Sequence, residues 1–301
     1  MAEITIASAR GDAAAACLAL LPDLASPDAV LFEARDGDGI LVAAGGLVWK
    51  SWDGSGAMPA WITVLPDARR MGVGRALIDT LAACAAEEGA DLIAARPVDE
   101  ESDEASFAVA TGCTPFRRHH FFEADARDFL QVIAPLVDRL KNRSRVPADA
   151  RVVPLSSVPI DEVKWLVARE MTTAPPVVAH ILANVSASPS GDGIDYARSC
   201  ALIVGDTVAG ALLSQRIAGR NASSVICNVI DPRWRGGWAN AVLLDRFART
   251  SIADGCFRIA FDCDETVRDT IGLATRSKAD RLAVRTRYRY AAVTAANVRR
   301  R

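Results

Sequence analysis

The residues best suited to chemistry lie in one short stretch, VLPDARRMGVGRAL, which spans residues 64–77. An apolar run stops at Pro66, and three arginines and two glycines follow as a helix-forming segment begins. A strand that ends in glycines and leads into a helix points free backbone N–H groups, together with the positive end of the helix dipole, at one spot. Glycine lets a ligand oxygen approach the main chain, and arginines add charge-assisted hydrogen bonds. The stretch therefore predicts a phosphate-binding loop.

Two common phosphate loops do not fit this stretch. A Walker loop needs Gly-Lys-Ser/Thr, whereas Gly74 is followed by Arg75 and Ala76. A dinucleotide fingerprint needs a third glycine or alanine at position 77, which is leucine, and it belongs to a parallel βαβ unit. The strands predicted before this loop form an antiparallel meander instead.

The elements that would position the loop follow from hydrophobic periodicity and turn signals. In the first half we expect strands at 3–7, 29–35, 40–49, 61–65, 91–95 and 116–123, and helices at 12–21, 75–88, 100–111 and 126–143. In the second half we expect strands at 151–155, 201–204, 208–214, 224–230, 258–262 and 281–293, and helices at 161–171, 177–185, 239–253 and 265–277. The same order of elements appears twice, which indicates a duplicated α+β domain.

With these elements around it, the stretch Val64 to Gly74 resembles the acyl-CoA-binding motif of the GNAT superfamily of N-acyltransferases, V-x-P-x-x-(Q/R)-x-x-G-x-(G/A). Every specified position matches. The resemblance covers residues 3–123 as one domain and, by element order, 150–293 as a second. It implies an α+β fold of two GNAT-like domains, each a mixed, mainly antiparallel twisted sheet flanked by helices. The expected boundaries are 1–125 for the acyl-CoA-binding domain, 126–149 for a connecting helix and linker, and 150–301 for the second domain.

The resemblance also implies a binding mode for acetyl-CoA or another coenzyme A thioester. The amides of Met71 to Ala76 would hold the pyrophosphate, and the main chain of Ile62 to Leu65 would pair with the pantetheine arm as an extra strand would. The candidate cofactor-binding residues are Ile62, Val64, Leu65, Arg69, Arg70, Met71, Gly72, Val73, Gly74, Arg75 and Ala76. The plainer alternative is that Gly72 and Gly74 only make a tight turn from strand to helix.

The second copy departs from the motif in the stretch 229–244, VIDPRWRGGWANAVLL. If Pro232 is aligned with Pro66, Arg235 falls on the motif's arginine, and Trp238 and Asn240 fall on its two small positions. A bulky indole there would block or reshape a pyrophosphate seat, so we expect the second domain to be degenerate. Against this, the two arginines and two glycines at 233–237 still form a plausible anion site.

Acyl transfer to an amine needs a base for the amine, a donor for the tetrahedral oxyanion and, least of all, a proton for the leaving thiolate. Many GNAT enzymes use a tyrosine four residues before a glycine as the acid; counting back from Gly112 gives Ala108. The three tyrosines of the chain all lie in its second half, at 196, 288 and 290. The resemblance therefore leaves the acid unassigned.

The candidate catalytic residues are Glu33, His119 and Asp262. Glu33 lies within a strand in a region that often forms the acceptor wall, although burial with a salt partner would also explain it. His119 and His120 are neighbours on a strand, so only one of them can face a cleft, and a structural histidine is the alternative. Asp262 and Asp264 share a face at a strand end, a place suited to recognising an amine.

Charge and composition limit the classes of partner that the protein can have. Residues 1–150 carry 14 Lys/Arg and 23 Asp/Glu, whereas residues 151–301 carry 21 and 14. Two oppositely charged domains docking on each other would explain this asymmetry, and so would a basic half that receives an acidic partner such as an acyl carrier protein. No nucleic-acid-binding motif and no apolar run long enough to span a membrane is present.

The cysteines bear on the compartment. Seven of them are scattered without a C-x-x-C pair, and Met1-Ala2-Glu3 leads directly into a strand-like segment. We therefore expect a cytoplasmic protein with reduced thiols, no signal peptide and no metal site.

The function expected from the sequence is an acetyl-CoA-dependent N-acyltransferase. It would transfer the acyl group directly, through a tetrahedral intermediate, to a primary amine of a small molecule or peptide. The alternatives are a non-catalytic acyl-CoA-binding scaffold and an acyltransferase that uses a longer acyl chain or an acyl carrier protein as donor.

Overall fold

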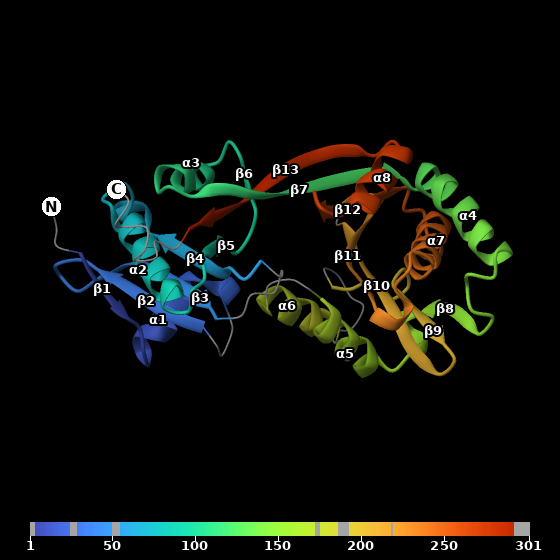
Figure 1. The fold of residues 1–301 in the computed structure, drawn as a ribbon, viewed down its shortest axis with the longest axis horizontal. Coiled ribbons are helices and arrows are strands. Elements are labelled where there is room, and N and C mark those ends of the chain that lie inside the picture. The colour runs from blue at the N-terminus through green and yellow to red at the C-terminus, as the bar shows by residue number, and fades with distance from the viewer. Residues whose placement is uncertain are drawn as a thin grey trace. The chain divides into compact units, whose positions relative to one another are not determined.

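The computed structural model describes residues 4–24, 29–49, 55–171, 175–185, 193–217 and 219–291 (Figure 1). The chain folds into two compact units that are not contiguous in sequence. Unit 1 is built mainly from residues up to Arg118 together with those from Arg285 onward. Unit 2 is built from residues 119–171 and 178–284.

Unit 1 carries the loop on a mixed, mostly antiparallel sheet. Its elements are β1 (Thr5–Ser8), α1 (Asp12–Leu20), β2 (Ala29–Arg35), β3 (Leu41–Val48), β4 (Met58–Val64), α2 (Val73–Glu87), β5 (Leu92–Ala94), β6 (Val98–Asp99), α3 (Asp103–Ala110) and the end of β13 (Asp280–Tyr290). The strand order is β1-β2-β3-β4-β5-β13, with β6 also paired to β13. Among the described strands of unit 1, β4 and β5 form the one parallel pair.

Alternation along β3 explains the layers of unit 1, because successive side chains of a strand point to opposite faces. Ala44 and Val48 pack in the cluster that holds Cys17 of α1. Ala43 and Leu47 belong to the clusters formed with α2 on the other face. The sheet therefore lies between α1 and α2.

Unit 2 repeats the same plan. Its elements are the end of β7 (Thr114–Asp125), α4 (Ala126–Asn142), β8 (Ala150–Pro154), α5 (Ile160–Glu170), α6 (Pro175–Val185), β9 (Cys200–Val204), β10 (Thr207–Ile217), β11 (Ala222–Ile230), α7 (Trp238–Ala253), β12 (Arg258–Asp264) and α8 (Arg268–Arg276). The strand order is β7-β12-β11-β10-β9-β8, and β11 and β12 are the parallel pair. Both sheets fit the predicted α+β class.

Helix α4 belongs to the core of unit 2. We expected residues 126–149 to be a connecting helix and linker, but Phe129, Ile133 and Val137 are buried in the cluster that α7 and the sheet form. The helix begins where Asp125 accepts backbone hydrogen bonds from Arg127 and Asp128. Its apolar face, spaced three and four residues apart, is what draws it onto the sheet.

The closing strands of the two units are exchanged along the chain. Residues 119–125 of β7, which we expected to close the first domain, pair with β12. Conversely, Arg289 and Tyr290 of β13, expected in the second domain, pair with Ile93 and Leu92 of β5. The ion pair between Arg289 Nη2 and Asp91 Oδ2, at 2.5 Å, and the hydrogen bond from Tyr290 to Asp79, at 2.8 Å, hold β13 in unit 1.

Candidate functional site

The site begins where β4 and β5 diverge. The two strands pair in parallel only from Met58 to Ala60, and the last link is the bond from the Ala95 N–H to the Ala60 carbonyl, at 3.1 Å. Beyond Ala60, β4 pairs with β3 alone within the described part of the chain. A strand with one edge unpaired can accept another extended chain.

The phase of the β3–β4 ladder shows which backbone groups are exposed to the gap. The Leu65 N–H donates to the Val42 carbonyl at 3.0 Å, and hydrogen-bonded pairs recur at every second residue of an antiparallel ladder. Odd-numbered residues of β4 therefore face β3. Ile62 and Val64 present their backbone N–H groups, and Ile62 its carbonyl, to the open side.

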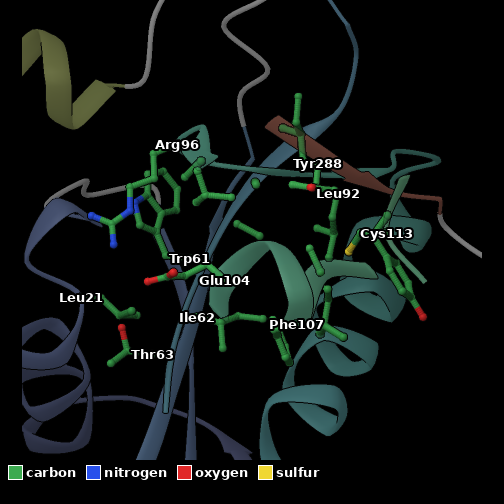
Figure 2. A pocket seen from close by; sticks show the side chains of 18 of the residues that line it. Leu21, Trp61, Ile62, Thr63, Leu92, Arg96, Glu104, Phe107, Cys113 and Tyr288 are labelled. Atoms are coloured by element: carbon green, nitrogen blue, oxygen red, sulfur yellow. The ribbon is translucent and has the colours of Figure 1, made fainter. Parts of the chain in front are cut away.

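A cavity of about 400 Å³ occupies this gap (Figure 2). It reaches both faces of the sheet: Ile78 of α2 and Phe107 of α3 line one side, and Leu21 and Trp61 line the other. The remaining lining residues are Leu20, Pro22, Ala60, Ile62, Thr63, Leu92, Ile93, Ala94, Ala95, Arg96, Val98, Glu104, Ala108, Cys113, Tyr288 and Tyr290. Most are apolar, so the cavity suits a thioester arm with a small number of polar groups to orient it.

The predicted loop closes one end of β4. A 3-10 turn at Pro66–Ala68 leads to Gly72, whose φ of 87° favours glycine, and α2 starts at Val73. No side chain caps this helix end, and its first ladder bond runs from the Ala76 N–H to the Gly72 carbonyl. The amides of residues 73–75 therefore have no acceptor within the helix.

Gly74 has a different role from the one expected. A Cβ at this position would lie 2.8 and 3.0 Å from Cε2 and Cζ of the Phe107 ring, whereas nothing lies within 4 Å of a Cβ at Gly72. The first glycine is thus needed for its backbone conformation. The second lets α3 pack closely against the start of α2.

The arginines of the loop carry charge that no carboxylate neutralises. Arg69 Nε donates to the Val64 carbonyl at 3.2 Å, and Arg75 donates to the Ala110 carbonyl. In the described residues neither of them, nor Arg70, pairs with an acidic side chain. The loop therefore combines free amides with uncompensated positive charge, as a diphosphate seat requires.

The second copy has the same loop with one residue fewer. Arg235 Nε donates to the Ile230 carbonyl at 3.2 Å, the counterpart of the bond from Arg69 to Val64. In unit 1 the N-cap Gly72 follows Arg69 by three positions, and in unit 2 the N-cap Gly237 follows Arg235 by two. Both glycines have a φ of 87°.

This deletion corrects the alignment made from sequence. Trp238 takes the place of Val73, and Ala239 takes that of Gly74. The Trp238 side chain is buried and packs edge-on against Trp234, with ring centroids 6.3 Å apart. It does not block the loop's open side, contrary to our expectation.

Ion pairs distinguish the second loop. Buried Asp231 accepts from Arg233 at 2.9 Å and from Arg169 at 2.7 Å, and Glu170 pairs with Arg235 at 2.7 Å. The hydrogen bond from Arg233 holds the pKa of Asp231 well below its usual range. Both arginines of this loop are therefore already paired with carboxylates within unit 2.

The three candidate catalytic residues do not meet in the cavity. Glu33 pairs with Arg35 at 2.8 Å on β2, as its plainer alternative foresaw. His119 lies with its Nδ1 3.5 Å from Asp262 Oδ2 and its Nε2 4.0 Å from Asp264 Oδ2, all within unit 2. None of the three lines the cavity in unit 1.

Two tyrosines that the sequence interpretation assigned to the second domain line the cavity instead. Tyr290 donates to Asp79, and burial is the first cause that raises the pKa of this phenol. Tyr288 is buried against Ala105 and Ala108 of α3. No local motif marks these residues, because their place depends on the strand exchange alone.

The cysteines show no sign of special chemistry. All seven are free, and burial raises the pKa of Cys200 and Cys227 to about 12 and that of Cys263 to about 11. Among the described residues no three potential metal ligands come together. No described helix combines the length and apolar character needed to cross a bilayer.

Comparisons with known proteins agree with this geometry. Residues 10–110 match the sequence model of the acetyltransferase (GNAT) family. No curated protein sequence matches the chain.

Solved structures extend the likeness to both units. A tandem GNAT protein from the clavulanic acid biosynthesis pathway has a TM-score of 0.52 at 16% identity, over 97% of this chain and all of the other. A GCN5-related N-acetyltransferase from Anabaena variabilis has a TM-score of 0.59 at 12% identity, over 95% and 72%. The glucosamine N-acetyltransferase region of a fungal multi-domain β-N-acetylglucosaminidase has a TM-score of 0.57 at 12% identity, and this chain spans 38% of that protein.

At these identities the structures show the fold, and the family match carries the relationship. Residues 10–110 thus match the acetyltransferase (GNAT) family in sequence, and nearly the whole chain has the fold of a tandem GNAT protein.

Proposed function

We propose that the protein is an acetyl-CoA-dependent N-acyltransferase whose working site is the cavity of unit 1. One observation supports this above all. The open edge of β4 at Ile62 and Val64 leads directly to a loop of free amides and unneutralised arginines after Pro66. An extended arm that ends in a diphosphate needs both features in that order.

The loop and the edge of β4 would have separate roles in binding acetyl-CoA. The N–H groups at the start of α2, with Arg69 and Arg75, would hold the diphosphate. The open edge of β4 would orient the arm and supply a backbone N–H to the oxyanion of the tetrahedral intermediate. When bound, acetyl-CoA supplies an activated acyl group, and the protein's contribution is to align it with the amine.

Recognition of the amine would fall to the cavity wall that Trp61 and Glu104 share. Glu104 is the single carboxylate among the lining residues, and within the described part of the chain it makes no ion pair or hydrogen bond. A carboxylate and an indole can together receive an alkylammonium group. Glu104 thus replaces Glu33, His119 and Asp262 as our candidate for binding the acceptor and accepting its proton.

The two loops provide a matched test of the site. Arg69→Ala and Arg235→Ala each remove an arginine that donates to the last residue of its strand. Calorimetric titration with CoA should show about tenfold weaker binding for Arg69→Ala, because a charge-assisted hydrogen bond contributes about 1.5–3 kcal/mol. Arg235→Ala should leave the affinity unchanged. The reverse pattern would place the nucleotide in unit 2 and end the proposal.

Turnover separates an enzyme from a binding protein. Thiol release from acetyl-CoA should depend on an added primary amine and should fall in Glu104→Gln, while CoA binding persists. Binding without thiol release across polyamines, amino sugars and peptide lysines would favour the non-catalytic alternative.

A further inference from the structure

We propose that Tyr288, delivered to unit 1 by strand β13, donates the proton that the leaving thiolate takes up. This inference rests on the proposed function and names the missing acid of that same site. The first tyrosine of the chain is Tyr196, so a tyrosine acid for this site must come from the second half of the sequence.

The register places Tyr288 at the closed end of the gap between β4 and β5. Arg289 and Tyr290 pair with Ile93 and Leu92, so the antiparallel register brings Tyr288 level with Ala94. Ala94 is also the last residue of β5 that pairs with β4, through Ala60. The diphosphate loop lies at the other end of β4, so a thioester at the tip of an extended arm would reach the end where Tyr288 lies.

The space for the phenol ring comes from α3. Tyr288 packs against Ala105 and Ala108, with Ala94, Val98 and Cys113 around it. Ala108 is the position four residues before Gly112, where a larger side chain would compete for this space. The small residues of α3 and the aromatic residue of β13 are therefore complementary.

The other proton donors on this side of the cavity are engaged. Tyr290 donates to Asp79 at 2.8 Å, and Cys113 Sγ lies 3.6 Å from the Thr111 hydroxyl. The Tyr288 hydroxyl has no hydrogen-bond partner among the described residues, and Tyr288 lines the cavity. Figure 2 shows Tyr288 on the side of Leu92 and Cys113, while Arg96, Trp61 and Thr63 lie on the opposite side.

The step balances without another reagent. The amine nitrogen attacks the thioester carbonyl carbon and its extra proton leaves to a base or to water. The C–S bond then breaks with its electron pair going to sulfur, as the Tyr288 O–H proton passes to that sulfur. The products are the amide and CoA thiol, and the tyrosinate regains its proton from solvent.

The test is the ionisation of bound CoA, because it needs no acceptor. A hydroxyl that donates to the sulfur stabilises the thiolate, so the thiol of CoA bound to the wild-type chain should titrate lower than free CoA. Tyr288→Phe should raise the titration midpoint of the bound CoA thiol by about one pH unit. The ultraviolet absorbance of the thiolate measures this titration. Tyr196→Phe is the control: it removes a tyrosine hydroxyl that donates to the Val185 carbonyl in unit 2, away from the cavity.

Kinetics give the second readout. Tyr288→Phe should lower kcat with acetyl-CoA about tenfold, with little change in the KM for acetyl-CoA. If CoA binds both proteins with the same affinity and its thiol titrates alike in both, the assignment of Tyr288 is wrong although the binding site stands. If CoA does not bind the wild-type chain, the proposed function fails and this inference fails with it.

Discussion

Gly72 and Gly74 are two positions apart in the loop, yet the structure needs each for a separate reason. At Gly72 a side chain would have room but the backbone has a φ of 87°. At Gly74 the backbone is helical, and the Phe107 ring occupies the space where a Cβ would project. The shape of the loop at residues 66–74 therefore depends on α3, which is not part of the motif.

Gly74→Ala tests this dependence. The new methyl group would push the Phe107 ring out of place, with a cost of about 1–3 kcal/mol in unfolding free energy and weaker CoA binding. Phe107→Ala in the same chain removes the clash, so the double variant should be more stable than additivity of the two single variants predicts. Denaturant unfolding of all four proteins measures this, and strict additivity would show that the ring does not constrain the loop.

Asp231 gives a pH-dependent prediction. Its pKa is lowered in the folded protein, first by the hydrogen bond from Arg233. A lowered folded-state pKa stabilises the protein above the unfolded value, near 3.9 for aspartate, and this contribution is lost as the pH falls below it. Asp231→Asn should therefore reduce the unfolding free energy by about 1–3 kcal/mol at neutral pH.

The same difference should shrink as the pH is lowered through about 4 and below, because the unfolded chain then binds a proton at Asp231 that the folded chain does not yet bind. Denaturant unfolding of both proteins over this range is the measurement. A difference that stays constant down to the lowest pH would mean that Asp231 acts through shape and not through its charge.

At the scale of elements, the two loops share a plan and differ in charge balance. Glu170 and Asp231 pair with the arginines of the second loop, whereas Leu65 stands in the first loop at the position of Asp231. Calorimetry of the wild-type chain should accordingly give one CoA per chain. Glu170→Gln removes the carboxylate that pairs with Arg235, so it should add a second, weaker CoA-binding event. Arg69→Ala should not remove this second event. An unchanged stoichiometry would show that charge alone does not inactivate the second loop.

Most helices and strands could be predicted from the sequence. Periodicity placed nearly every helix and strand, because an amphipathic helix such as α4 and an alternating strand such as β12 carry their pattern locally. The two-residue strand β6 is too short to carry such a pattern. The one-residue deletion before Gly237 was also missed, since a loop's length is fixed by backbone geometry and not by matching letters.

The cleft itself was predicted only in part. Strand β4 and the loop after Pro66 follow from the motif, and the structure adds the gap beside Ile62 that makes them a site. The rest of the wall comes from β13. Strand pairing between distant segments has no local signature, so the choice of which unit a closing strand joins could not be made from sequence.

At the scale of the whole molecule, the exchange of the closing strands β7 and β13 makes the cavity of unit 1 depend on the last described residues of the chain. Residues 285–290 add β13 to β5 and β6, and bring two tyrosines into the cavity. Besides the ladder, polar contacts hold this segment: Arg285 with Asp99, Thr286 with Glu100, Arg289 with Asp91 and Tyr290 with Asp79. A stop after Val284 should therefore abolish CoA binding although the whole motif of residues 64–74 remains.

A charge exchange tests the same dependence without removing any backbone. Arg289 and Asp91 lie 2.5 Å apart with side chains 36% and 24% exposed, so the pair contributes on the order of 1 kcal/mol, and reversing either charge alone places like charges together. Arg289→Asp and Asp91→Arg should each lower stability and weaken CoA binding several-fold, because β13 then loses its hold on β5. The double variant restores opposite charges, and it should recover both properties if the C-terminal strand positions the cavity wall. Recovery of stability without recovery of CoA binding would mean that β13 supports the fold of unit 1 but takes no part in its site.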